Sequence, residues 1–291
     1  MCRLFGMSAG TEPVKATFWL LEAPDSLAQQ SRREPDGTGV GYFDPSGRPQ
    51  VAKQPLAAYE DQQFAREAHE VSSPTFVAHV RYASTGAVRA ENTHPFEQEG
   101  RLFAHNGVIG DLPALERELG DAMKLVHGET DSERFFALIT REIARTASVG
   151  DGIVAAASWV AEHLEVFALN LVLITPSELY ALRYPDVHEL HVLERAAGGT
   201  SGARHMDQAS ARGSVRVRSG ELGSRRSVVV ATEKMDEGQG WHELGSGQLL
   251  HVDADLNVRV KTVIDRPPAR PLKLADLDPR AAASQAPEAH A

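Results

Sequence analysis

Cys2 is the only cysteine in the 291 residues, and it stands directly behind the initiator methionine. If an aminopeptidase removes Met1, Cys2 carries both a thiol and the α-amine of the chain. A free α-amine has a pKa of about 7.7–8.0 in unperturbed peptides, so it can serve near neutral pH as the base for its own side chain. The position therefore predicts an N-terminal nucleophile, and an incidental cysteine on an edge strand is an equal alternative.

Four further residues carry groups that can bind parts of a substrate. Arg81 lies inside the apolar stretch "AHVRYASTG", where its planar guanidinium suits bidentate binding of a carboxylate. In "HNG", Asn106 offers a side-chain amide and Gly107 a backbone N–H, and such a pair can hold a developing oxyanion. Asp131 falls in the first turn of a predicted helix, where the helix dipole favours a carboxylate.

Each of these residues also has a simpler structural interpretation. Arg81 can pair with a structural carboxylate, Asn-Gly is a common hairpin turn, and an acid such as Asp131 suits any helix N-terminus. Taken together, the positions supply a nucleophile with a base, oxyanion donors, a carboxylate-binding cation and an amine-binding anion. A substrate with an α-amino-acid head and a side-chain acyl group fits these parts. Glutamine or a γ-glutamyl amide is the obvious candidate.

Three histidines, His79, His94 and His105, stand close to these motifs. Two lie on predicted apolar strands, where a structural histidine is the more common case. Their spacing matches no helical zinc motif, and one cysteine excludes cysteine-rich zinc sites. We therefore expect neither a metal nor another cofactor.

The elements that must position these residues are short strands, then two helices, then more strands. The segment "TDSERFFALITREIART" is the clearest amphipathic helix, with Thr130 as N-cap and Glu133 three residues later in a capping-box pattern. "GTGVGYF" is a strand whose glycines suggest close approach of another backbone or a ligand. This order predicts an α+β domain with two sheets covered by helices, not an alternating βαβ fold. Other predicted strands include "CRLFGMSA", "PTFVAHVRYAS", "GRLFAHNGVIG", "SVVVATE" and "GQLLHVD", and "VKATFWLLEA" and "DSLAQQSRR" have helical spacing.

Composition limits the classes of function. The net charge of −10 argues against a nucleic-acid backbone as the main partner. No run of eighteen apolar residues is present, and the N-terminus lacks the pattern of a secretory signal. A lone cysteine suits a reducing compartment, so we expect a cytoplasmic protein. The basic, glycine- and serine-rich stretch 196–214, around Arg204 and Arg212, is interpreted as a linker loop, and the alternative is that it borders the pocket on the side of the leaving group.

In combination and in order, the N-terminal Cys2 and the stretches "DGTGVGYF", "HVRYASTG", "ENTHPF", "HNG" and "ETDSE" resemble a class II glutamine amidotransferase. The "MCR" start and the later "VVVATE" segment resemble a stand-alone subgroup that includes the ergothioneine-pathway γ-glutamyl amidohydrolase and the yeast glutathione-degrading amidotransferase. The resemblance implies a four-layer αββα N-terminal-nucleophile hydrolase fold over residues 2–264. Residues 265–291 are then a Pro/Ala-rich tail, disordered or loosely docked.

The resemblance also assigns roles to residues. Cys2 is then the nucleophile and its α-amine the base, while Asn106 and the Gly107 amide form the oxyanion hole. Arg81 binds the substrate carboxylate with Ser84 near it, Asp131 holds the substrate ammonium group, and His94 matches a histidine of several family members. Thr38 stands where the family often has an aromatic residue, so that wall of the pocket is expected to differ.

These roles favour an amidohydrolase that acts alone, because the chain after residue 260 is too short for a synthase core. The alternatives are a glutaminase subunit that supplies ammonia to a separate synthase, a non-catalytic glutamine sensor, and an N-terminal-nucleophile hydrolase of acyl amides. An acyl substrate needs an apolar pocket, whereas Arg81 and Asp131 favour an amino-acid head group. Self-association and a synthase partner both stay open at this point.

Overall fold

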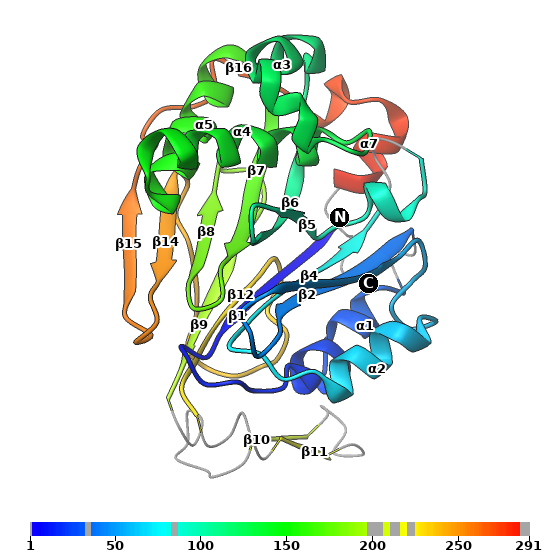
Figure 1. Cartoon of the computed structure of the whole chain (residues 1–291). Helices are drawn as coiled ribbons and strands as arrows, with labels where there is room; N and C mark the ends of the chain where they lie inside the picture. Colours follow the sequence, from blue (N-terminus) through cyan, green and yellow to red (C-terminus); the bar gives the residue numbers. More distant parts are fainter. Residues whose placement is uncertain are drawn as a thin grey trace.

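Two antiparallel sheets stack face to face and are covered on their outer sides by helices (Figure 1). The computed structural model describes residues 2–32, 36–82, 87–196 and 225–285, together with the backbone of 206–209 and 216–219. Within these residues the layers run helix, sheet, sheet, helix, with α3, α4 and α5 on one side and α1 and α2 on the other. This arrangement confirms the expected α+β fold with four αββα layers.

The first sheet has the order β13–β9–β12–β1–β4–β2–β3, with strands β1 Arg3–Ser8, β2 Gly37–Phe43, β3 Pro49–Gln54, β4 Thr75–Arg81, β9 His191–Arg195, β12 Ser227–Ala231 and β13 Trp241–Glu243. The second has the order β15–β14–β8–β7–β6–β5, with β16 beside β7, and its strands are β5 Phe96–Gln98, β6 Arg101–Ile109, β7 Glu165–Ile174, β8 Leu179–Arg183, β14 Gln248–Val252, β15 Val258–Thr262 and β16 Arg270–Pro271. A separate hairpin pairs β10 Met206–Ala209 with β11 Arg216–Ser219.

Helices connect and cover these sheets. The α-helices of the described residues are α1 Leu27–Gln30, α2 Gln62–Glu70, α3 Leu112–Leu119, α4 Asp131–Thr146, α5 Val149–His163 and α7 Pro279–Gln285. The tighter and wider turns are the π-helix η1 Phe18–Glu22 and the 3₁₀ helices η2 Ala90–Asn92, η3 Gly120–Leu125 and η4 Leu274–Asp276. The segment "VKATFWLLEA", which has helical spacing, thus forms one π-helical turn. None of the described helices is long and apolar enough to cross a membrane.

Three apolar cores separate the four layers. One lies between the sheets, where Leu4 of β1 packs with Val172 of β7. The second lies under α4 and α5, and the third joins η1, α1 and α2 to the outer face of the first sheet. Alternate residues of each strand enter different cores, since successive side chains point to opposite faces. The start of β1 and the end of β4, which lie side by side in the first sheet, are therefore packed on both faces.

The glycine-rich strand β2 confirms the expected close approach of another backbone. A Cβ on Gly39 would lie 2.1 Å from the carbonyl oxygen of His94, and one on Gly41 would lie 2.9 Å from Pro95 Cγ. Glycine is needed here because the segment before β5 crosses directly over the strand. That crossing brings His94 to the sheet that carries Cys2 and Arg81.

The helix α4 begins as its sequence predicts, with one change. Thr130 Oγ1 accepts the backbone N–H of Glu133 at 3.2 Å, which is the predicted N-cap. The Glu133 carboxylate does not complete the reciprocal box and instead accepts the N–H of Gly128 at 2.6 Å. The acid therefore fixes the loop before the helix, and so it helps to set the position of Asp131.

The Pro/Ala-rich tail follows the body of the domain as far as residue 285. β16 pairs with β7 in parallel, and η4 and α7 come after it. Ser284 and Gln285 are 0% and 2% exposed. Residues 286–291 lie outside the described part, as do Arg204 and Arg212 of the basic stretch, of which only Ala196 and the β10 backbone are described.

Candidate active site

Cys2 lies immediately before β1, which is a central strand of the first sheet. Its Sγ is held by the backbone of Tyr82, which donates its N–H at 3.2 Å and offers its carbonyl oxygen at 3.4 Å. The residue is 7% exposed. These two backbone contacts fix the position of the sulfur. Tyr82 was not singled out by the sequence, because a backbone contact leaves no mark on residue type.

Asn106 and Gly107 come from the middle of β6, in the second sheet. Asn106 Nδ2 donates to the carbonyl oxygen of Cys2 at 3.1 Å, so the amide bridges the two sheets at Cys2. A Cβ on Gly107 would lie 1.8 Å from the carbonyl oxygen of Ala168. The "HNG" motif is therefore not a hairpin turn but part of a long central strand. Its glycine is required by the neighbouring strand β7.

Arg81 ends β4 and is 4% exposed. Its Nη1 donates to the carbonyl oxygen of Ala87 at 3.2 Å. Burial lowers the pKa of Arg81, and the charges of Cys2, Asp36 and Asp131 oppose that lowering. A guanidinium stays protonated under such conditions, so Arg81 remains a buried cation in the same pocket as Cys2.

Asp131 is the first residue of α4 and is 3% exposed. Its Oδ2 accepts the backbone N–H of Ile109 at 2.9 Å, three residues beyond Asn106 on β6. Its Oδ1 lies 3.5 Å from Ser132 Oγ. The bond to β6 fixes the carboxylate in the same pocket as Asn106 and Gly107. An acid that only stabilised the helix N-terminus would need no such hydrogen bond to a strand.

The three histidines form the buried wall of the pocket. His79 and His94 lie with ring centroids 4.2 Å apart, and their ring nitrogens have no hydrogen-bond partner among the described residues. His105 Nδ1 lies 2.9 Å from Ser132 Oγ. Burial lowers the pKa of all three, that of His79 to about 3 and that of His94 well below its usual range. Burial thus favours the neutral form of all three side chains, and His79 takes up almost no proton at pH 7.

One cavity gathers these groups. Its lining contains six residues predicted from sequence and six that the sequence did not single out for the site: Cys2, Arg81, His94, Asn106, Gly107 and Asp131, then His79, Tyr82, His105, Thr130, Ser132 and Gln285. Ser84 lies outside the described residues. No group of three or more metal-binding side chains occurs in the described residues. A buried thiol, an amide donor, a cation and a carboxylate thus share a single small pocket.

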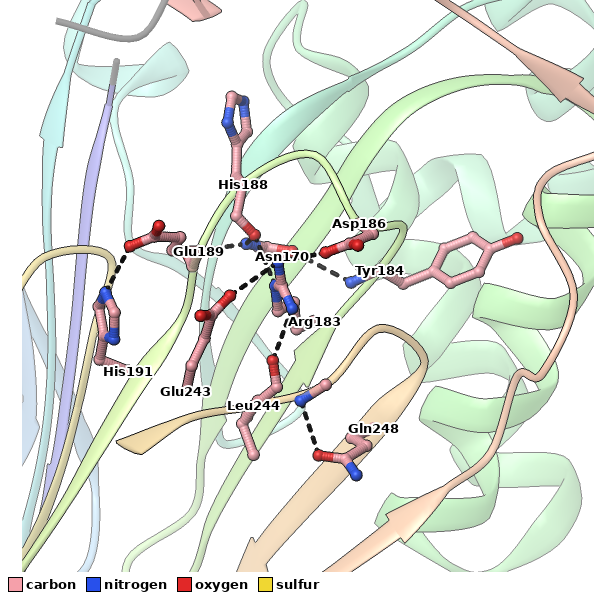
Figure 2. A network of polar contacts seen from close by, with 11 residues as sticks. Asn170, Arg183, Tyr184, Asp186, His188, Glu189, His191, Glu243, Leu244 and Gln248 are labelled. Carbon is pink, nitrogen blue, oxygen red and sulfur yellow. Dashed lines mark hydrogen bonds and ion pairs between the residues drawn. The ribbon is translucent and has the colours of Figure 1, made fainter. Parts of the chain in front are cut away.

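The unexpected member of this lining is Gln285, from the last turn of α7. Its Oε1 accepts a hydrogen bond from His188 Nε2 at 2.7 Å. His188 sits in the loop between β8 and β9, and Figure 2 shows its ring pointing away from the polar network that holds its backbone. Neither residue stands in a motif, so only the tertiary fold reveals them.

A cysteine just before a central strand, facing an Asn-Gly pair on the opposite sheet of a four-layer αββα domain, is the arrangement of the N-terminal-nucleophile hydrolase fold. The family model for class II glutamine amidotransferases matches residues 1–271. The chain therefore belongs to the class II glutamine amidotransferases.

Two curated relatives are described as putative glutamine amidotransferases. One, from Haemophilus influenzae, is 30% identical over 150 residues, which are 50% of this chain and 49% of the relative. The other, YafJ of Escherichia coli K12, is 32% identical over 154 residues, which are 50% of this chain and 56% of the relative. The matched region thus spans about half the length of these relatives.

The fold has solved counterparts. The glutamine phosphoribosylpyrophosphate amidotransferase of B. subtilis superposes with a TM-score of 0.62 at 20% identity, covering 91% of this chain and 50% of that one. At that identity the likeness concerns the fold alone. It shows that nearly the whole of this chain matches one half of a larger amidotransferase.

Proposed function

We propose that this protein is an amidohydrolase that cleaves glutamine or a γ-glutamyl amide through a thioester on Cys2. The observation that carries the proposal is the meeting of Cys2, Arg81, Asn106, Gly107 and Asp131 in one buried pocket. Arg81 and Asp131 offer opposite charges for the carboxylate and ammonium groups of one amino-acid head. Asn106 and the nucleophile stand beside each other, as attack on a side-chain carbonyl requires.

In the proposed reaction the Cys2 thiolate attacks the γ-carbonyl carbon and forms a C–S bond. The carbonyl oxygen gains the negative charge and is bound by Asn106 Nδ2 and the Gly107 N–H. The C–N bond then breaks, and the α-amine of Cys2 returns to the leaving amine the proton that it took from the thiol. Water next attacks the thioester, releasing glutamate and restoring the thiol.

The neutral histidine wall supports the α-amine as the base. A side chain whose pKa is about 3, such as His79, takes up almost no proton at neutral pH. The proposal requires Met1 to be removed, since an acylated nitrogen on Cys2 has no basic lone pair. A thiol nucleophile suits a reducing compartment, so we place the reaction in the cytoplasm.

The test is glutamate release by the purified chain from glutamine and from a panel of γ-glutamyl amides. Cys2→Ala removes the nucleophile and should abolish release, and Cys2→Ser should retain at most a trace because an alcohol is far less acidic than a thiol. Full activity in Cys2→Ala would overturn the mechanism. Intact-mass measurement on each preparation gives the fraction that begins at Cys2.

A second candidate is a glutaminase subunit that delivers ammonia to a separate synthase. It is favoured by the match of this chain to one half of a larger amidotransferase. Activity that appears only when a stable partner is bound would support it, and steady release by the chain alone supports the hydrolase. Absence of glutamate release and of any reaction of Cys2 with a glutamine-like electrophile would instead indicate a sensor.

A further inference from the structure

The C-terminal strap, residues 270–285, crosses the sheet that carries the oxyanion donors. It begins with β16, whose Arg270 lies opposite Glu165 of β7, and Leu272 N–H donates to the carbonyl oxygen of Val166 at 2.8 Å. Three leucines of the strap then pack on a small apolar cluster of β6 and β7: Leu272, Leu274 and Leu277 against Val108, Phe167 and Ala168. Val108 directly follows Gly107, so the strap is anchored beside the catalytic strand.

The helix α7 carries the strap to the pocket. Asp278 Oδ1 accepts the backbone N–H groups of Arg280 at 3.0 Å and Ala281 at 3.1 Å, which starts the helix. Seven residues later Gln285 reaches the wall of the Cys2 pocket, and Figure 1 shows α7 above the start of β1. Arg280 Nη2 lies 4.0 Å from Asp36 Oδ2, on the loop before β2.

A rigid platform receives the end of this helix. The His188 carbonyl oxygen accepts Arg183 Nε at 2.7 Å and Asn170 Nδ2 at 3.2 Å (Figure 2). The His188 ring lies against Phe167, with ring centroids 5.3 Å apart. Gln285 therefore docks on a fixed imidazole, and the buried His188–Gln285 bond of 2.7 Å closes one side of the pocket.

With Gln285 docked, the pocket is too small for an amino acid. Its free volume is about 20 Å³, enough for about one water molecule. Sites that hold small organic ligands measure roughly 300–1,000 Å³. The other described lining residues belong to the central strands, to the segments joined to them, or to the start of α4. Gln285 alone among them comes from a terminal helix of seven residues.

We propose that α7 is a size-selective gate over Cys2, and that Gln285 is the residue that sets how large a leaving amine the pocket accepts. Opening moves the end of α7 away from His188 while the leucines keep the strap attached to β6 and β7. A small leaving group such as ammonia needs a small opening, and a bulky γ-glutamyl amide needs a larger one. The part that concerns leaving groups rests on the proposed function, whereas the gate itself does not.

The gate can be tested without any substrate, because Cys2 is the only thiol and intact mass therefore reads its alkylation alone. Gln285→Ala removes the bond to His188 and part of the pocket wall. We expect Cys2 to react about tenfold faster with iodoacetamide, the factor expected for the loss of one buried hydrogen bond. The gain should be larger with the bulkier N-ethylmaleimide.

Two further variants separate gating from general damage. Leu277→Ala loosens the strap outside the pocket and keeps the Gln285 side chain itself. It should therefore raise both alkylation rates, and the rate with N-ethylmaleimide should rise more than the rate with iodoacetamide. Gln63→Ala, a matched change on α2 that removes a hydrogen bond with Gln54, should leave them within twofold of the wild type. A thermal melt of each variant identifies any that fail to fold. Alkylation rates in Gln285→Ala and Leu277→Ala that stay at the wild-type value for both reagents would overturn the gate.

The selectivity is tested by steady-state glutamate release from glutamine and from γ-glutamyl-p-nitroanilide. Gln285→Ala should raise kcat/KM for the anilide about tenfold relative to glutamine, and an unchanged ratio would contradict the size filter. If no variant and no wild type releases glutamate while the alkylation rates still change as expected, the proposed function fails and the gate stands. If glutamate is released and the alkylation rates do not change, the proposed function stands and the gate fails.

Discussion

Replacing Asn106 by alanine tests the oxyanion assignment, because the structure separates what this side chain does for the fold from what it does for the reaction. Asn106 Nδ2 has two N–H bonds, and one is donated to the Cys2 carbonyl oxygen at 3.1 Å. Among the described residues Nδ2 makes no second hydrogen bond. We expect that second N–H to bind the oxyanion.

The two contributions differ in size. Losing one oxyanion donor costs about 10²–10³ in kcat, or about 2.7–4 kcal/mol of transition-state stabilisation. Losing the bond to Cys2 costs about 1 kcal/mol of folding free energy. For a chain of this length that is a fall of about 2–4 °C or less in Tm. Asn106→Ala should therefore be folded at assay temperature, with a nearly unchanged KM and a kcat lower by two to three orders of magnitude.

Steady-state glutamate release gives kcat and KM, and differential scanning fluorimetry gives Tm. Asn106→Asp keeps the shape of the side chain but places a negative charge where the oxyanion develops, so its kcat should fall further than that of the alanine variant. Asn257→Ala, which loses exposed hydrogen bonds to Asp253, is the matched control and should retain wild-type kcat. A kcat for Asn106→Ala within tenfold of the wild type, or a loss confined to KM, would refute the assignment.

Three other outcomes follow from the pocket. Arg81→Lys should raise KM about 10–100-fold with kcat little changed, since a point charge replaces a bidentate fork; an unchanged KM would speak against carboxylate binding. Gly107→Ala places a Cβ 1.8 Å from the Ala168 carbonyl oxygen, so we expect about 1–3 kcal/mol less stability and a large fall in kcat, and wild-type values of both would contradict the close packing. The His79 pKa is about 3 in the fold and about 6.5 when unfolded, so stability should be lost as pH falls from 6.5 towards 3, by about 1.4 kcal/mol per pH unit. Urea unfolding between pH 7 and pH 4 should show a shallower slope for His79→Gln, and an equal slope would show that His79 does not contribute.

Part of this site could be predicted from sequence because Arg81 ends a strand and Asp131 begins a helix. The strand "GTGVGYF" coincides with β2, and the "TDSE" start of α4 carries its N-cap on Thr130 as expected. Local patterns of alternation and capping fix such elements without reference to the rest of the chain. Cys2 and Asn106 were each ambiguous alone, and their convergence is visible only when both sheets are in place.

What the sequence could not supply depends on contacts between distant segments. The Sγ–backbone contact joins residues 2 and 82, and the His188–Gln285 bond joins two positions with no motif. The Pro/Ala-rich composition of the tail gave no sign that Leu272, Leu274 and Leu277 pack on β6 and β7. An Asn-Gly pair favours a turn locally, yet in β6 the neighbouring strand decides the conformation of Gly107.

Covalent trapping of Cys2 tests the central claim most directly. The purified chain is incubated with a glutamine analogue that carries a diazoketone in place of the γ-amide, and its mass is measured intact and after peptide mapping. The account predicts one adduct, on the Cys2 sulfur of a chain that begins at Cys2, slowed by excess L-glutamine and absent in Cys2→Ala. Glutamate release by a chain that shows no adduct on Cys2, or equal activity in a chain that retains Met1, would contradict it.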